Sequence, residues 1–88
     1  MNIDELRRDI DGIDDELLGL FERRMAAAKE IGRYKKENSL PIKDSERERK
    51  IILRLCERAE PELAEYVKSL FVSLFEISSD YQSQNPAD

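Results

Sequence analysis

A single uninterrupted helix pattern dominates the first part of the chain. No proline occurs between Ile3 and Glu37, and Asn2 is placed to cap the start of a helix. Apolar residues recur at alternating steps of three and four, which predicts one α-helix with an apolar seam; the seam begins with Ile3, Leu6, Ile10, Ile13, Leu17 and Leu20. Such a helix is roughly 50 Å long, whereas a compact chain of 88 residues has a diameter of only about 30 Å. The helix therefore projects from its own monomer, and a second, twofold-related copy is the economical way to cover it.

Two shorter helices are expected after it. The stretch NSLP, residues 38–41, interrupts the first pattern. A second helix is expected from about residue 43 to 58, with Asp44 or Ser45 in its first turn. A third begins at Pro61, because proline suits the first position of a helix. No segment alternates with the period of two that strands require. The sequence thus predicts an all-α fold, with one long and two shorter helices in an intertwined homodimer.

Composition limits the classes of function. Fifteen Lys and Arg against 20 Asp and Glu give a net charge of -5, which argues against nucleic acid as a general partner. One cysteine, Cys56, excludes an internal disulfide framework, and without any histidine it does not make a metal site. No apolar run approaches the roughly 20 residues of a membrane span, and the acidic N-terminus does not resemble an export signal. We therefore expect a single cytoplasmic domain over residues 1–88, with a frayed tail over 82–88.

Charged side chains interrupt the first apolar seam. Its next step falls on Arg24, and Lys35 follows eleven residues later, about three turns along nearly the same line. Between these two cations the helix carries small residues, Ala27, Ala28 and Gly32. The cations thus flank a gap of roughly 16 Å between backbones. Long side chains from both ends can close on something small and anionic.

The other two helices also turn from apolar to polar along their core-facing sides. Asp44, Arg47 and Glu48 precede the apolar stripe of the second helix, and Ser78 and Gln82 extend that of the third. Taken singly, each fits a solvated helix end or a surface ion pair. Burying an ion without a partner costs several kcal/mol, so together these groups need each other or a ligand. Three cations against two carboxylates leave one excess positive charge, which suits a ligand with carboxylates.

The motifs resemble those of the all-helical chorismate mutases. They are an early LR, then I..ID..LL.L...R, G..K, P..D..RE and S...Q, and they extend over nearly all of the chain. The resemblance implies an intertwined dimer that converts chorismate to prephenate, a step toward phenylalanine and tyrosine, without a metal or cofactor. By this resemblance the family's active-site positions fall on Arg7, Arg24, Lys35, Asp44, Arg47, Glu48, Ser78 and Gln82.

The resemblance assigns the arginines to the two carboxylates of the substrate. Arg7, Arg24 and Arg47 carry planar forks that suit carboxylates, and Ser78 supports one of them. Arg7 and Arg24 are 17 residues apart, which is roughly 25 Å along the helix and about 100° around it. Two such side chains of one straight helix cannot hold the same small dianion. Arg7 is therefore expected to come from the partner chain.

The remaining positions are assigned to the reacting part of the substrate. Lys35 and Gln82 are expected to donate to the ether oxygen, and Glu48, with the helix start near Asp44, to hold the ring hydroxyl. We take Lys35, Gln82, Arg24 and Glu48 as the catalytic group. Two alternatives remain open at this stage: an isochorismate pyruvate-lyase on the same fold, and a non-catalytic helical dimerisation module.

Overall fold

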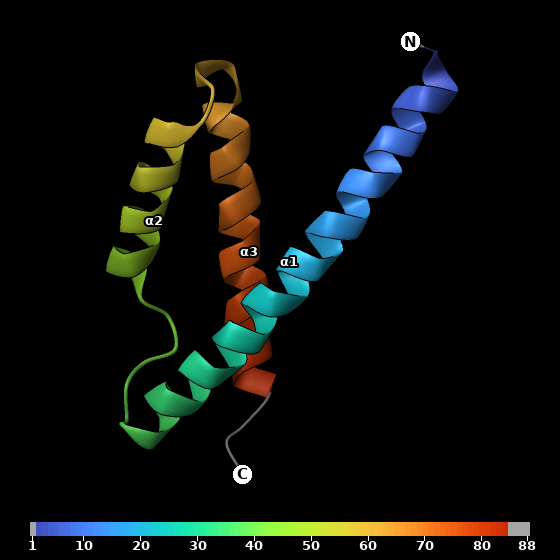
Figure 1. Cartoon of the computed structure of the whole chain (residues 1–88). Helices are drawn as coiled ribbons and strands as arrows, with labels where there is room; N and C mark the ends of the chain where they lie inside the picture. Colours follow the sequence, from blue (N-terminus) through green and yellow to red (C-terminus); the bar gives the residue numbers. More distant parts are fainter. Residues whose placement is uncertain (1, 85–88) are drawn as a thin grey trace.

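The chain folds into three α-helices and one short 3-10 helix. The computed structural model describes residues 2–84. Helix α1 spans Ile3–Glu37, α2 spans Ser45–Arg58, the 3-10 helix η1 spans Pro61–Leu63, and α3 spans Ala64–Gln84 (Figure 1). No strand occurs among the described residues. The predicted all-α class and the predicted extent of the long helix are confirmed.

Helix α1 starts at a side-chain cap and continues without a break. Oδ1 of Asn2 accepts a hydrogen bond from the backbone N–H of Glu5 at 2.9 Å, which satisfies one of the free donors at the helix start. Gly12 and Gly19 lie inside the helix, and neither divides it into two elements. Ser39 follows with a φ of 54°, in the left-handed region, where the chain turns toward α2.

The start of α2 is fixed by Asp44. Its Oδ1 accepts a hydrogen bond from the backbone N–H of Arg47 at 3.0 Å, so Asp44 is the cap and Ser45 is the first helical residue. Asp44 thus stands just before the first turn rather than within it. Pro61 opens the short 3-10 helix, and regular α-helix begins three residues later, at Ala64.

Helix α3 extends further than the sequence predicted. Residues 82–84, the first part of the expected tail, are helical in the structure. Ser83 and Gln84 are polar but compatible with a helix. The rest of the expected tail, residues 85–88, lies outside the described residues.

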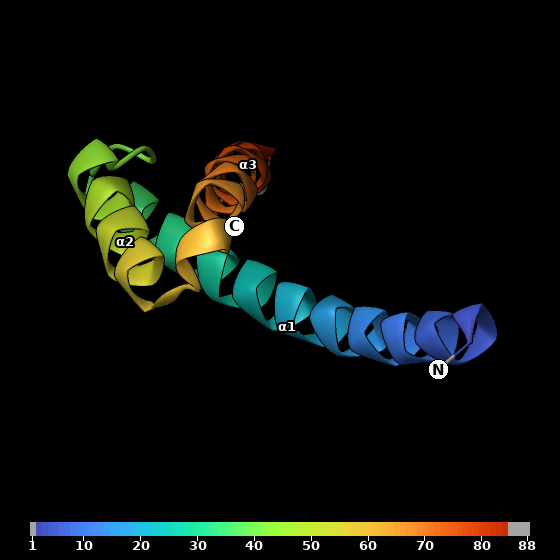
Figure 2. The same cartoon turned by 90° about the horizontal axis from the view of Figure 1, so that it is seen from above.

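The monomer leaves much of α1 uncovered. Helices α1 and α2 both pack against α3, and the N-terminal half of α1 extends away from both (Figures 1 and 2). Six apolar side chains of the seam, from Ile3 to Leu20, are between 44% and 59% exposed. Among the described residues only two apolar ones, Ala28 and Phe75, are buried. Within residues 2–84 the buried apolar side chains therefore lie where the C-terminal half of α1 meets α3.

The dimensions agree with an open shape. The radius of gyration is 16.1 Å, against about 12 Å for a compact chain of this length. The accessible surface is 7205 Å², against about 5,400 Å² for a compact monomer of 10.3 kDa. No helix within residues 2–84 combines the length and the apolar character needed to cross a membrane.

Candidate functional site

A cleft lies between the C-terminal half of α1, the start of α2 and the C-terminal part of α3. Its volume is about 400 Å³, within the usual range for small-molecule sites. Seven of the eight residues predicted from the sequence line this cleft: Arg24, Lys35, Asp44, Arg47, Glu48, Ser78 and Gln82. The eighth, Arg7, lies on the exposed N-terminal part of α1 and is not among its lining residues.

Arg24 is held against α3 at one end of the cleft. Its Nη1 donates a hydrogen bond to Oγ of Ser78 at 2.7 Å, and its Cζ lies 5.8 Å from the centre of the Phe75 ring. Both α3 residues are buried, with 8% of Ser78 and 7% of Phe75 exposed. The hydroxyl and the ring face fix the guanidinium in one orientation. Only one of its five N–H donors is used by Ser78, so the others can bind a ligand.

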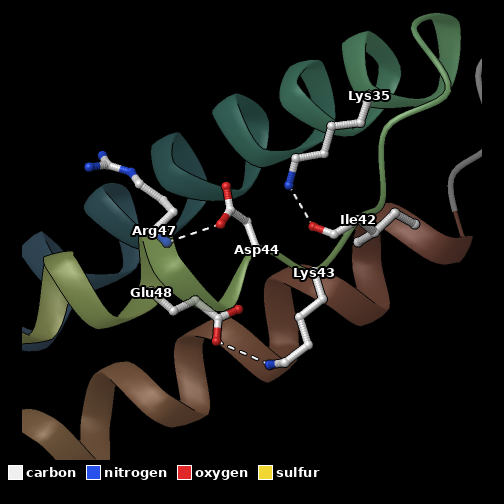
Figure 3. Close-up of polar contacts among 6 residues, drawn as sticks. All are labelled: Lys35, Ile42, Lys43, Asp44, Arg47 and Glu48. Carbon is white, nitrogen blue, oxygen red and sulfur yellow. Dashed lines mark hydrogen bonds and ion pairs between the residues drawn. The ribbon is translucent and has the colours of Figure 1, made fainter.

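Lys35 lies at the other end of the cleft and ties α1 to the segment before α2. Its Nζ donates to the backbone carbonyl oxygen of Ile42 at 2.5 Å (Figure 3). An ammonium group has three donors. The contact with Ile42 therefore orients the Lys35 side chain and leaves two protons for a ligand.

The residues at and just before the start of α2 supply groups of both signs. Nζ of Lys43 lies 3.1 Å from Oε1 of Glu48, whose side chain is only 21% exposed (Figure 3). The carboxylate of Asp44 is engaged in capping the helix. The Arg47 guanidinium has no hydrogen-bond or ion-pair partner among residues 2–84. Three cations, Arg24, Lys35 and Arg47, against the two carboxylates leave the cleft one excess positive charge that can act on an anion.

Helices α1 and α3 approach closely beside the cleft. Gly32 is buried, and a Cβ atom built at this position would lie 2.9 Å from Cγ and 3.1 Å from Cβ of Gln82. The amide group of Gln82 has no hydrogen-bond partner within residues 2–84. The close approach therefore presents a free amide at the cleft, on the helix opposite Lys35.

The sequence reasoning missed several lining residues. Ser79 lines the cleft, as do three isoleucines, one from α1, one from the connecting segment and one from α2. Ser79 could have been found, because it stands four residues after Phe75 and three before Gln82. Ile42 carried no such signal, because it lies outside the helices and its position depends on the path of the connecting segment.

Comparison with known proteins gives one matching family model and several curated relatives. A family model described as chorismate mutase type II matches residues 6–83. The chain is 52% identical over 54 residues to a bifunctional chorismate mutase/prephenate dehydratase of Aquifex aeolicus, 40% over 55 residues to a chorismate mutase of Methanocaldococcus jannaschii, and 38% over 60 residues to a T-protein of Haemophilus influenzae. These alignments cover 58%, 59% and 68% of this chain, and 15%, 56% and 15% of the respective relatives. No solved structure matches the chain significantly.

Proposed function

The chain belongs to the chorismate mutase type II family, and on that premise we propose that it catalyses the rearrangement of chorismate to prephenate. The observation that carries the proposal is the gathering of Arg24, Lys35, Arg47 and Gln82 around one cleft of small-molecule size. The proposed enzyme acts in the cytoplasm, in the synthesis of phenylalanine and tyrosine.

The chemistry accounts for the residue types in the cleft. The rearrangement is unimolecular: one C–O bond breaks while one C–C bond forms within the same molecule. It needs neither a nucleophile nor a proton shuttle. The enzyme must hold the substrate in a compact, chair-like geometry and stabilise the negative charge that develops on the ether oxygen. Fixed cations and neutral hydrogen-bond donors perform both tasks.

Arg24 and Arg47 bind the carboxylates of the substrate. The remaining N–H donors of Arg24 and the unpartnered guanidinium of Arg47 are suited to the paired oxygens of a carboxylate. Ser78, which accepts a hydrogen bond from Arg24, supports this end of the site through that contact.

Lys35 and Gln82 donate to the ether oxygen. They line the cleft from opposite helices, and both retain donors that no described residue uses. A well-placed donor of this kind contributes about 3 to 4 kcal/mol to the stabilisation of the transition state. Glu48 and the helix start at Asp44 hold the ring hydroxyl. Lys35, Gln82, Arg24 and Glu48 are thus the proposed catalytic group.

The active form is an intertwined homodimer in which each site takes Arg7 from the partner chain. The surface in excess of a compact monomer is about 1,800 Å² per chain, or about 3,600 Å² per pair, which is within the range of obligate dimer interfaces. A fourth cation against two carboxylates raises the excess charge of the cleft to two, which matches a dianion. The exposed seam and the distant Arg7 both support this arrangement.

A chorismate-consumption assay on the purified chain, with prephenate identified as the product, tests the proposal. Failure of the folded protein to consume chorismate would refute it. Isochorismate is the matched second substrate, and a higher kcat/KM for pyruvate release from it would assign the cleft to the lyase reaction. Titration with a transition-state mimic addresses the non-catalytic alternative, because a mere dimerisation module would not bind the mimic at millimolar concentration.

A further inference from the structure

We propose that Gly32 is a positioning residue for Gln82, and that the missing side chain at this position sets where the Gln82 amide lies in the cleft. The inference rests on the proposed function, in which Gln82 donates to the ether oxygen. It adds a residue that does not line the cleft itself but contacts the α3 residue that does.

The backbone conformation does not explain the glycine. No glycine within residues 2–84 has a positive φ, so any L-residue except proline can adopt the backbone conformation of Gly32. A glycine inside a helix also weakens it relative to alanine. What Gly32 provides is space, because a Cβ atom there would lie 2.9 Å from Cγ, 3.1 Å from Cβ and 3.5 Å from Cα of Gln82.

Movement of the end of the Gln82 side chain alone would not make room for a Cβ atom at position 32. Rotation about χ1 moves Cγ but leaves Cβ in place, so Gln82 must change rotamer and α3 must also shift slightly. Gly32 stands three residues before Lys35 and therefore lies on the adjoining face of α1. The spacing of α1 and α3 at Gly32 thus sets the separation of the two proposed ether-oxygen donors.

The test is Gly32→Ala, with Gly12→Ala and Gly19→Ala as matched controls. All three make the same exchange inside α1, but a Cβ at Gly12 or Gly19 meets nothing within 4 Å. Each control position also lies two residues after a seam position, about 160° around the axis from it. We expect Gly32→Ala to lower kcat about a hundredfold, as for a misplacement near 1 Å, with KM within about threefold of wild type. The controls should keep wild-type kcat.

A double-variant comparison separates positioning of Gln82 from a general disturbance of the site. Gln82→Ala removes the Cγ atom that a new Cβ at position 32 would approach most closely. It also removes the amide that Gly32 is proposed to position, so in that background Gly32→Ala should lower kcat by no more than about threefold. The same hundredfold loss in both backgrounds would overturn the proposal, as would wild-type kcat in Gly32→Ala alone.

The outcomes also separate this inference from the proposed function. A wild-type chain that does not consume chorismate would refute the function, whatever the glycine variants do. An active wild type with an unaffected Gly32→Ala variant would refute only the positioning role. If Gly32→Ala does not fold, the double variant is compared with Gln82→Ala directly, and a kcat lower by more than about tenfold overturns the proposal.

Discussion

If each site is shared between subunits, two inactive variants with different substitutions should regain activity when they form mixed dimers. Arg7→Ala and Arg24→Ala chains are unfolded, mixed in equal amounts and refolded together. Each variant alone lacks one arginine in both of its sites. Loss of a charge-assisted contact that contributes about 3 kcal/mol lowers activity more than about a hundredfold, so each variant alone should be almost inactive.

The geometry of α1 favours the proposed sharing. Arg7 and Arg24 stand 17 residues apart on a helix that the structure shows as one continuous element. Their backbones are therefore separated by roughly 25 Å, and they differ by about 100° in direction around the axis. Only Arg24 lines the cleft. Arg7 of the same chain is too far away to hold the same small dianion.

Random pairing fixes the size of the recovery. About half of the refolded dimers are mixed, and each mixed dimer has one site with both defects and one site with neither. The mixture should therefore recover to about a quarter of the wild-type activity per chain. The assay is the initial rate of chorismate consumption, normalised to folded chain. No recovery, with mixed dimers verified by native mass spectrometry, would refute the assignment of Arg7 to the partner's site.

A reciprocal mixture provides the matched control. Wild-type chain is refolded with an equal amount of an Arg7→Ala/Arg24→Ala double variant. If the sites are shared, both sites of every mixed dimer carry one defect, so activity falls to about a quarter per total chain. If each chain completes its own site, one site per mixed dimer stays intact and activity is about half. Sharing of sites therefore predicts the higher activity in the first mixture and the lower activity in the second.

Further predictions concern the catalytic group and the dimer. Lys35→Ala should lower kcat at least about a hundredfold with an unchanged circular dichroism spectrum, because its contact strengthens in the transition state; near-normal kcat would show that Lys35 is misassigned. Glu48→Gln should retain more activity than Glu48→Ala, because an amide oxygen still accepts a hydrogen bond; equal losses would mean that the charge matters instead. The melting temperature should rise with chain concentration, because folding is coupled to dimerisation, and a constant value for a monomer by light scattering would exclude the dimer.

Local signals in the sequence were sufficient for the long helix. Asn2 is a cap residue, and no proline interrupts the pattern before the end of α1 at Glu37. Capping and proline each affect the backbone only within a few residues, so both effects can be predicted without knowing the fold. The gathering of seven charged and polar residues around one cleft was also predictable, because each lies on the core-facing side of its helix or at its start.

Contacts that depend on the path of the chain could not be predicted. The hydrogen bond from Lys35 to the Ile42 carbonyl oxygen depends on the turn in which Ser39 takes a φ of 54°. Glycine, rather than serine, is the residue type that predicts a positive φ. The fixed φ of Pro61 fits the first turn of an α-helix and also that of a 3-10 helix, so the late start of α3 could not be predicted. The close approach of Gln82 to Gly32 depends on the distance between α1 and α3, which no residue pattern encodes.

In the proposed dimer the N-terminal half of α1 contributes both to folding and to the active site. Its seam has no cover within the monomer, and the described part of one chain buries only two apolar residues. The same half of the helix carries Arg7, which one chain cannot bring to its own cleft. In the proposed dimer both needs are met by one event, because a partner that covers the seam would also bring its Arg7 to the other chain's site. A small chain with a modest core can therefore remain marginal alone, since in the proposed dimer stability and the complete charge of the site come together on dimerisation.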